Sequence, residues 1–335
     1  MAIGQGLALV LLAGVTMGGN LVPMKWMKAY KWENFWLIYS IMALVVVPLA
    51  LAFIMLPRIG SVYASLSLKT MFLPFLYGLT WGIAQLGAGI CVHRIGLGLT
   101  GSILNGICAA GGAFIPLCGK HPELLLRKSG LLIILGTAVM AIGLAFCGWA
   151  GRERERATGQ LQSAGSGYVA ILLLAMVSGF MASFLNVALA YGGEIVTKAQ
   201  QAGAAPQWAP FAVWPIALAG GFLTNVFYCF YKFSRNHTWT NFGGGPREAF
   251  NPLLAGALWM IATAIYTSGA TFLGTLGLSA GWALFQIALI LTGNVAGLLT
   301  GEWKQMPAKI SRVNIQGVAV LFLAVVIIAA ANFSG

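Results

Sequence analysis

The sequence predicts an all-α integral membrane protein, and three observations lead to this fold class. Only 8% of the 335 residues are charged and 59% are hydrophobic, and the mean hydropathy is +0.86. A water-soluble domain of this length needs many more charged residues on its surface. The charges that are present stand in short clusters between long uncharged runs, which is the pattern of loops between membrane spans.

Uncharged runs of spanning length follow one another along the chain. A helix that crosses the hydrocarbon core of about 30 Å needs about 20 mostly apolar residues. Such runs cover residues 3–24, 34–57, 70–92, 95–119, 129–151, 167–193, 209–231, 249–301 and 313–335. The run 249–301 is too long for one helix, and Gly274-Thr-Leu-Gly277 is a natural turn, so it is divided in two. The prediction is ten transmembrane helices.

The second half of the chain repeats elements of the first. Trp81-Gly-Ile-Ala-Gln85 and Leu97-Gly-Leu-Thr-Gly101 correspond to Trp259-Met-Ile-Ala-Thr263 and Leu276-Gly-Leu-Ser-Ala-Gly281. Chance similarity between Gly/Leu-rich helices is the alternative, but the matches fall at matching helix numbers, which favours duplication. Five helices per half give the two halves opposite topology, and such inverted repeats enclose a site near the membrane midplane.

This pattern predicts a division of the chain into three parts. The first repeat covers residues 1–150, with helices 1 to 5, and the second covers residues 167–335, with helices 6 to 10. A charged cytoplasmic linker at residues 151–166 joins them, beginning with Arg152-Glu-Arg-Glu-Arg156.

The basic residues predict the orientation in the membrane. The net charge is +12, but the Lys and Arg residues stand singly or in threes at the ends of apolar runs and form no continuous face for nucleic acid. Thirteen of the nineteen fall in loops after helices 1, 3, 5, 7 and 9. By the positive-inside rule those loops are cytoplasmic, and both termini are extracytoplasmic. No basic segment precedes the first apolar run, so we expect helix 1 to be retained.

Several elements together resemble one transporter family. They are Lys31-Trp-Glu33 with Phe35-Trp36 before helix 2, Gly78-Leu-Thr-Trp-Gly82 in helix 3, Trp259 with Tyr266 and Gly269 in helix 8, and Gly301-Glu-Trp303 after helix 9. The combination extends over nearly the whole chain and resembles the L-rhamnose–proton symporter family of the drug/metabolite transporter superfamily. The resemblance implies a drug/metabolite transporter-like fold of ten helices in inverted repeats, and uptake of L-rhamnose or a related deoxy sugar across the bacterial inner membrane.

Uncharged polar and aromatic side chains form stripes on equivalent helices of both halves. A sugar site needs amides and hydroxyls for the substrate hydroxyls and flat rings for its C–H faces, and polar side chains in a membrane usually turn inward. The predicted substrate contacts are Asn20, Trp81, Gln85, Asn105, Asn186, Trp259, Thr263, Tyr266, Trp282 and Gln286. Two alternatives stay open: membrane tryptophans commonly anchor at the interface, and single Ser, Thr or Asn residues bond neighbouring helices.

The acidic residues give no clear proton site. The chain has no aspartate, and none of its seven glutamates lies in the middle of an apolar run. Glu33 and His93, at helix ends, are the candidates for proton coupling, although helix capping or pairing with Lys28 or Lys31 also explains Glu33. A proton or sodium gradient is the expected driving force. No cofactor is expected, and the five cysteines contain no CxxC pair that would suggest a metal site.

The leading hypothesis is alternating-access uptake of a neutral monosaccharide by a monomer or homodimer in the bilayer. An exporter or facilitator for another metabolite or an amphiphilic drug is the alternative within the same superfamily. An integral-membrane enzyme that modifies lipids or lipid-linked sugars is a more distant alternative, because no cluster of His, Glu and Asp has the spacing that such chemistry requires. We therefore predict a transporter and not an enzyme.

Overall fold

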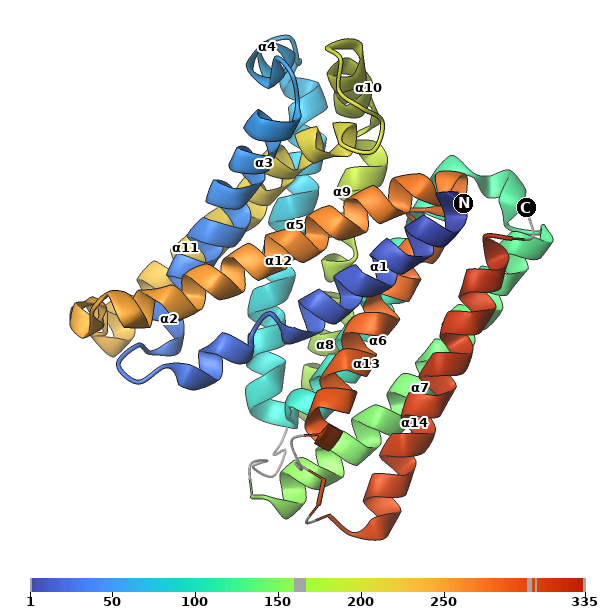
Figure 1. Cartoon of the computed structure of the whole chain (residues 1–335). Coiled ribbons are helices and arrows are strands. Elements are labelled where there is room, and N and C mark those ends of the chain that lie inside the picture. Colours follow the sequence, from blue (N-terminus) through green and yellow to red (C-terminus); the bar gives the residue numbers. More distant parts are fainter. Residues whose placement is uncertain (1, 160–166, 300–302, 305, 334–335) are drawn as a thin grey trace.

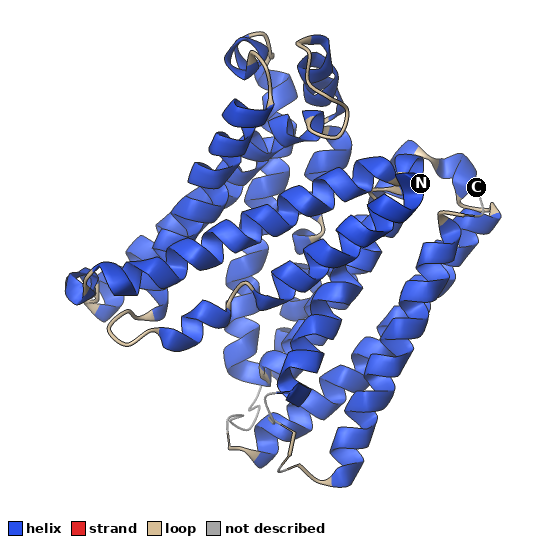
Figure 2. Cartoon of the chain, viewed as in Figure 1, coloured by secondary structure: helices blue, strands red, loops and turns tan. Residues whose placement is uncertain are grey.

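The computed structural model describes residues 2–159, 167–299, 303–304 and 306–333, and all regular secondary structure in these ranges is helical (Figure 1, Figure 2). The helices of the first half are α1 (Ala2–Gly19), α2 (Trp32–Ile41), α3 (Val47–Met55), α4 (Ile59–Ala64), α5 (Leu68–Ile95), α6 (Leu97–Lys120) and α7 (Lys128–Ala157). Those of the second half are α8 (Tyr168–Ala182), α9 (Phe184–Tyr191), α10 (Gly193–Gln201), α11 (Trp214–Asn236), α12 (Pro246–Phe272), α13 (Ala280–Leu299) and α14 (Ala308–Ala331).

Short 3-10 or π turns connect or interrupt several of these helices. They are η1 (Val22–Trp26), η2 (Met42–Val46), η3 (Pro122–Leu124), η4 (Ala209–Val213), η5 (Trp239–Gly244) and η6 (Gly274–Leu276).

The described residues contain nine helical segments that are long and apolar enough to cross a membrane, together with a shorter apolar helix, Ala280–Ala296. The prediction of a multi-pass helical membrane protein is therefore confirmed. The long run 249–301 is divided where the turn was predicted, since α12 ends at Phe272 and α13 begins at Ala280. Gly274 has a φ of +67°, a left-handed conformation that glycine adopts without steric cost.

Two spanning segments are interrupted where the sequence predicted continuous helices. In residues 34–57, the π turn η2 precedes Pro48, which has no N–H to donate to the carbonyl of Leu44. In the run that begins at residue 167, α8 ends at Ala182 and the Ser183 hydroxyl donates to the Phe180 carbonyl at 2.6 Å. The chain then continues through α9 and α10 to Gln201, beyond the predicted end at 193.

Helix α7 is longer than the predicted fifth helix. It continues to Ala157, so the first part of the predicted linker is a polar helical turn. Arg156 pairs with Glu153 at 2.8 Å, one turn apart, which is a favourable spacing on a helix surface. Residues 160–166, the rest of that predicted linker, lie outside the described residues.

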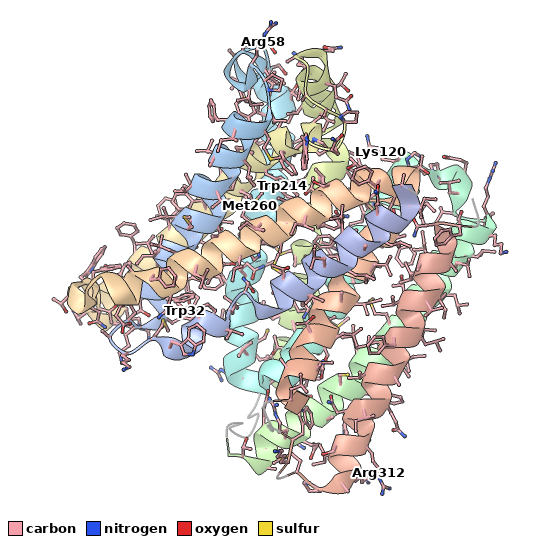
Figure 3. All side chains as sticks on the ribbon, viewed as in Figure 1. Trp32, Arg58, Lys120, Trp214, Met260 and Arg312 are labelled. Atoms are coloured by element: carbon pink, nitrogen blue, oxygen red, sulfur yellow. The ribbon has the colours of Figure 1, made fainter. Side chains whose placement is uncertain are left out.

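The helix ends fall on two opposite sides of the molecule. Both termini lie at the upper side with α4 and α10, and the connections α5–α6 and α13–α14 lie at the lower side (Figure 1). Arg58 and Lys120 lie near the upper side and Arg312 lies at the lower side, whereas Trp214 and Met260 lie between them (Figure 3). We call the upper side the terminal end and the lower side the opposite end.

Small residues allow the central helices to approach closely. Helix α1 packs against α12 and α13, α8 packs against α5 and α6, α5 packs against α11, and α7 packs against α14. Where α5 crosses α11, a Cβ atom on Gly78 would collide with the carbonyl of Ala217, and one on Gly82 would meet Thr224 and Gly221. This close approach holds Trp81, which lies between those two glycines, at a fixed depth in the bundle.

Candidate functional site

Two tryptophans from different halves of the chain meet in the centre of the bundle. Trp81 on α5 and Trp259 on α12 have ring centroids 5.6 Å apart and ring planes inclined by 37°. Each is 9% exposed. They occupy matched positions of the predicted repeat, and neither is an exposed anchor of the kind that Trp26 is, at 59% exposure. The pair offers a partly accessible aromatic surface deep in the molecule.

Gln85 and Asn105 are the predicted contacts whose amides are half-exposed. Gln85 lies one turn from Trp81 on α5, so the two share a face. It lies about 15 Å before the end of α5, and Asn105 lies about 12 Å after the start of α6, at about 1.5 Å per residue. Within the described part of the chain neither amide has a hydrogen-bond partner, which leaves both able to bind a polar ligand at similar depth.

Trp282 and Gln286 on α13 both bond to Cys108 of α6. The indole Nε1 of Trp282 donates to the Cys108 carbonyl at 3.1 Å, and Nε2 of Gln286 donates to its Sγ at 3.1 Å. All three residues are buried. The sequence suggested for Cys108 only a small apolar role, whereas the structure places it between two predicted site residues. Its position three residues from Asn105, on the same helical face, was the available signal.

The Asn186 side chain on α9 has a protein partner for each of its polar groups. Its Nδ2 donates to the carbonyls of Gly112 at 2.8 Å and Leu278 at 2.7 Å, and its Oδ1 accepts from the Tyr266 hydroxyl at 2.6 Å. The Gly112 carbonyl needs this donor because Pro116, four residues later in α6, has no N–H. Asn186 is fully buried and Tyr266 is 1% exposed.

The hydroxyls of α12 mostly bond to their own helix. Thr263 donates to the Trp259 carbonyl at 2.9 Å, and Thr267 donates to the Thr263 carbonyl at 2.7 Å. Trp214 of α11, which the sequence did not single out, donates from Nε1 to the Thr267 hydroxyl at 3.0 Å. This chain of bonds connects α11 to the same stripe of α12 that carries Trp259.

The remaining predicted residues lie farther toward the helix ends. Asn20 is 6% exposed and follows α1, where its side chain interacts with the Tyr39 hydroxyl of α2. His93 is in the last turn of α5, but its side chain lies outside the described residues.

Glu33 is buried at the start of α2. It is 2% exposed, and its Oε1 accepts hydrogen bonds from Asn236 Nδ2 at 2.9 Å and Thr238 Oγ1 at 2.7 Å. Lys232 is the nearby cation. The carboxylate therefore joins the start of α2 to the last turn of α11 and the loop after it, more than 200 residues away in the sequence.

Taken together, the centre of the bundle is uncharged, aromatic and amide-bearing. Such a site suits a neutral polar solute with both C–H faces and hydroxyls better than an ion.

Comparison with known proteins agrees with this geometry. The family described as L-rhamnose-proton symport protein matches residues 1–335. The chain belongs to this family. It is 28% identical over 326 residues to the L-rhamnose-proton symporter of Yersinia pestis (strain Pestoides F), covering 93% of this chain and 92% of that protein. It is 26% identical over 344 residues to that of Shigella boydii serotype 18, covering 100% and 98%.

Membership of the L-rhamnose-proton symport protein family confirms the predicted resemblance, and with it the prediction of a transporter and not an enzyme. The uncharged residues around Trp81 and Trp259 are therefore best regarded as part of a transport pathway. Sequence identity below 30% leaves the individual contacts to be argued from this chain's own geometry.

Proposed function

We propose that this chain carries L-rhamnose, or a closely related deoxy sugar, into the cell together with a proton. The relatives named L-rhamnose-proton symporter match it over nearly their whole length, which supports the substrate class and favours a proton over a sodium gradient. The observation that carries the proposal is the Trp81–Trp259 pair with the free amides of Gln85 and Asn105 beside it. Rings can stack on the apolar face and methyl group of a deoxy sugar while amides replace water at its hydroxyls.

The proposed fold is ten spans arranged as two inverted repeats, residues 1–150 and 167–335, joined by a cytoplasmic linker at 151–166. Helix α13 supplies the tenth span, since it continues to Leu299. The packing supports the repeat: α1 lies against α12 and α13, and α8, its counterpart, lies against α5 and α6. The last helices of the two halves, α7 and α14, pack against each other, as a two-fold relation requires.

The proposed orientation places both termini outside the cytoplasm of a bacterial inner membrane. The two termini lie at the same end, and the connections α5–α6 and α13–α14 lie at the opposite end (Figure 1). The loops assigned to that opposite end contain thirteen of the nineteen Lys and Arg residues, which favours a cytoplasmic location for it. The active unit is proposed to be a monomer or a homodimer.

Within the proposed site, the residues divide into two groups. Trp81, Trp259, Gln85 and Asn105 are accessible or unpaired in the present conformation and are the proposed first contacts of the sugar. The others are bonded to the protein or more buried, so they reach the substrate only if the conformation changes; they are Asn20, Asn186, Thr263, Tyr266, Trp282 and Gln286. Glu33 and His93 are the proposed proton-coupling residues.

Uptake of labelled L-rhamnose into cells that lack their own rhamnose transporter tests the proposal. We expect accumulation that unlabelled L-rhamnose competes with, accompanied by alkalinisation of a weakly buffered medium when the sugar is added. Accumulation without alkalinisation would instead indicate a facilitator. If no sugar accumulates, exchanges or competes, the sugar assignment is wrong and the alternative of an exporter for another solute gains support.

A further inference from the structure

Asn186 and Asn20 occupy matched positions of the two halves but differ sharply in their bonds. Asn186 uses both amide protons and its oxygen on protein partners from α6, α12 and the turn before α13. Asn20 interacts with the Tyr39 hydroxyl within its own half. In two inverted repeats that alternate access, matched residues exchange environments when the open side changes. The difference between the two asparagines therefore reports which end is closed.

We propose that Asn186 is a positioning residue that keeps the transport pathway closed at the terminal end. We call Asn186 with its partners Gly112, Leu278 and Tyr266 the Asn186 latch. The proposal rests on the alternating access proposed above. It assigns a role to hydrogen bonds that connect four spans, α6, α9, α12 and α13, through one side chain.

The surroundings of the latch place it near the terminal end. Leu278 lies in the turn between α12 and α13, and Tyr266 lies in the last two turns of α12. The Tyr191 ring, at the end of α9, lies 6.1 Å from the Tyr77 ring of α5, and Lys120 Nζ lies 4.6 Å from its centre. These contacts bring α5, α6 and α9 together on the same side of the Trp81–Trp259 pair, so the latch belongs to a continuous closed layer.

The opposite end lacks the matching contacts. By the matched Leu-Gly-Leu elements, the counterpart of Leu278 is Leu99, and the counterpart of Ser279 is Thr100. The Thr100 hydroxyl is buried and has no hydrogen-bond partner among the described residues. Residues 101–107 of α6 are all half-exposed. This end of the pathway is looser, and an orphan hydroxyl stands where the closed arrangement would provide a partner.

The two latches cannot be equal in strength. Counting from the matched tryptophans Trp81 and Trp259, the counterpart of Tyr266 is Ala88, which has no hydroxyl to donate. The bond from Tyr266 to Asn186 therefore has no equivalent at the other end. An extra bond favours the conformation that is closed at the terminal end, because a state is populated in proportion to its differential interactions.

Opening of the terminal end can be measured through Cys108. This thiol is 4% exposed and bonds to Gln286, directly inside the latch. In a background with C91A, C118A, C147A and C229A it is the single cysteine. Membrane vesicles of both orientations, with the accessible side identified by protease removal of a terminal tag, are treated with a charged, membrane-impermeant maleimide, and the labelling rate of Cys108 is followed.

From the terminal side we expect Asn186→Ala to be labelled roughly fivefold to tenfold faster, the factor that one lost net hydrogen bond gives. Tyr266→Phe removes a single bond and should give a smaller increase in the same direction. Asn294→Ala is the matched control, because Asn294 donates only to the Ile290 carbonyl of its own helix. From the opposite side the latch variants should not be labelled faster.

Three results overturn the latch: labelling of both variants at the control rate, faster labelling from the opposite side only, or equal acceleration from both sides, which would indicate general loosening. If Asn186→Ala does not fold, Tyr266→Phe decides alone. Failure of the transport assignment is separable from failure of the latch. Accelerated one-sided labelling with no sugar uptake by the unmodified chain would support the latch and reject the substrate, and uptake with unchanged labelling would do the reverse.

Discussion

The indole rings of Trp81 and Trp259, 178 residues apart in the sequence, face each other with their centroids 5.6 Å apart. Residues at matched positions of two repeats can contact each other only close to the axis that relates the repeats. The pair therefore marks the centre of the proposed two-fold arrangement, where inverted-repeat transporters bind their substrate.

Replacement of Trp81 tests whether this surface binds sugar. We expect Trp81→Ala to reduce L-rhamnose affinity by roughly tenfold or more, since an aromatic contact contributes about 0.5–1.5 kcal/mol beyond its buried area. Trp81→Phe keeps a flat ring and should retain most of the affinity. Trp26→Phe, at an exposed tryptophan, is the control. Concentration-dependent uptake measures all three, and equal affinities for the Ala variant and the control would remove Trp81 from the site.

The free amides of Gln85 and Asn105 give a sharper test. Because neither has a protein partner within the described part of the chain, Gln85→Leu and Asn105→Leu should leave the apparent melting temperature unchanged. Each should weaken sugar binding by roughly threefold to tenfold through one lost hydrogen bond. Ligand-induced thermal shift and uptake measure the two effects. Lower stability with unchanged binding would instead assign the amides to helix packing.

Much of the fold follows from local features of the sequence. The uncharged runs predict the spans, Gly274 predicts the turn between α12 and α13, and the repeated Trp-x-x-x-polar element predicts a tryptophan on each of two helices. The contact between those tryptophans is consistent with the repeat alone. These features succeed because hydrophobic length and glycine conformation act within a few residues.

The roles of individual polar residues depend on distant parts of the chain. Asn186 is bonded because Pro116, in another helix, leaves the Gly112 carbonyl without a donor. Glu33 is bonded by Asn236 and Thr238, which lie more than 200 residues later. Helical spacing shows which face a residue occupies but not which group is opposite it, so a stripe of predicted contacts contains both free amides and fully bonded ones.

Glu33 allows proton coupling to be separated from structure. Glutamine keeps an oxygen that can accept from Asn236 and Thr238, so Glu33→Gln should fold and exchange sugar. If Glu33 carries the coupled proton, this variant should lose sugar-driven alkalinisation and accumulation against a gradient. Glu153→Gln, at a residue paired with Arg156 outside the site, is the control.

Alkalinisation by Glu33→Gln at the unmodified rate would leave Glu33 with a structural role alone. That role has its own signature in Glu33→Ala, which leaves the Asn236 amide and the Thr238 hydroxyl without their acceptor. A buried donor without a partner costs about 1–3 kcal/mol, so the alanine variant should be clearly less stable than the glutamine variant.

The crossing of α5 and α11 predicts a difference between two glycines of one helix. A Cβ on Gly78 would overlap the Ala217 carbonyl, whereas one on Gly89 would meet no atom within 4 Å. Gly78→Ala should therefore destabilise the protein by about 1–3 kcal/mol, because the backbone must move to relieve the overlap. Gly89→Ala should be neutral or stabilising, since alanine favours a helix over glycine by about 1 kcal/mol. Melting curves at one scan rate compare them, and equal effects would mean that the two helices do not cross at Gly78. Because Trp81 lies one turn from Gly78, a destabilised crossing should also weaken sugar binding, whereas Gly89→Ala should bind sugar as the unmodified chain does.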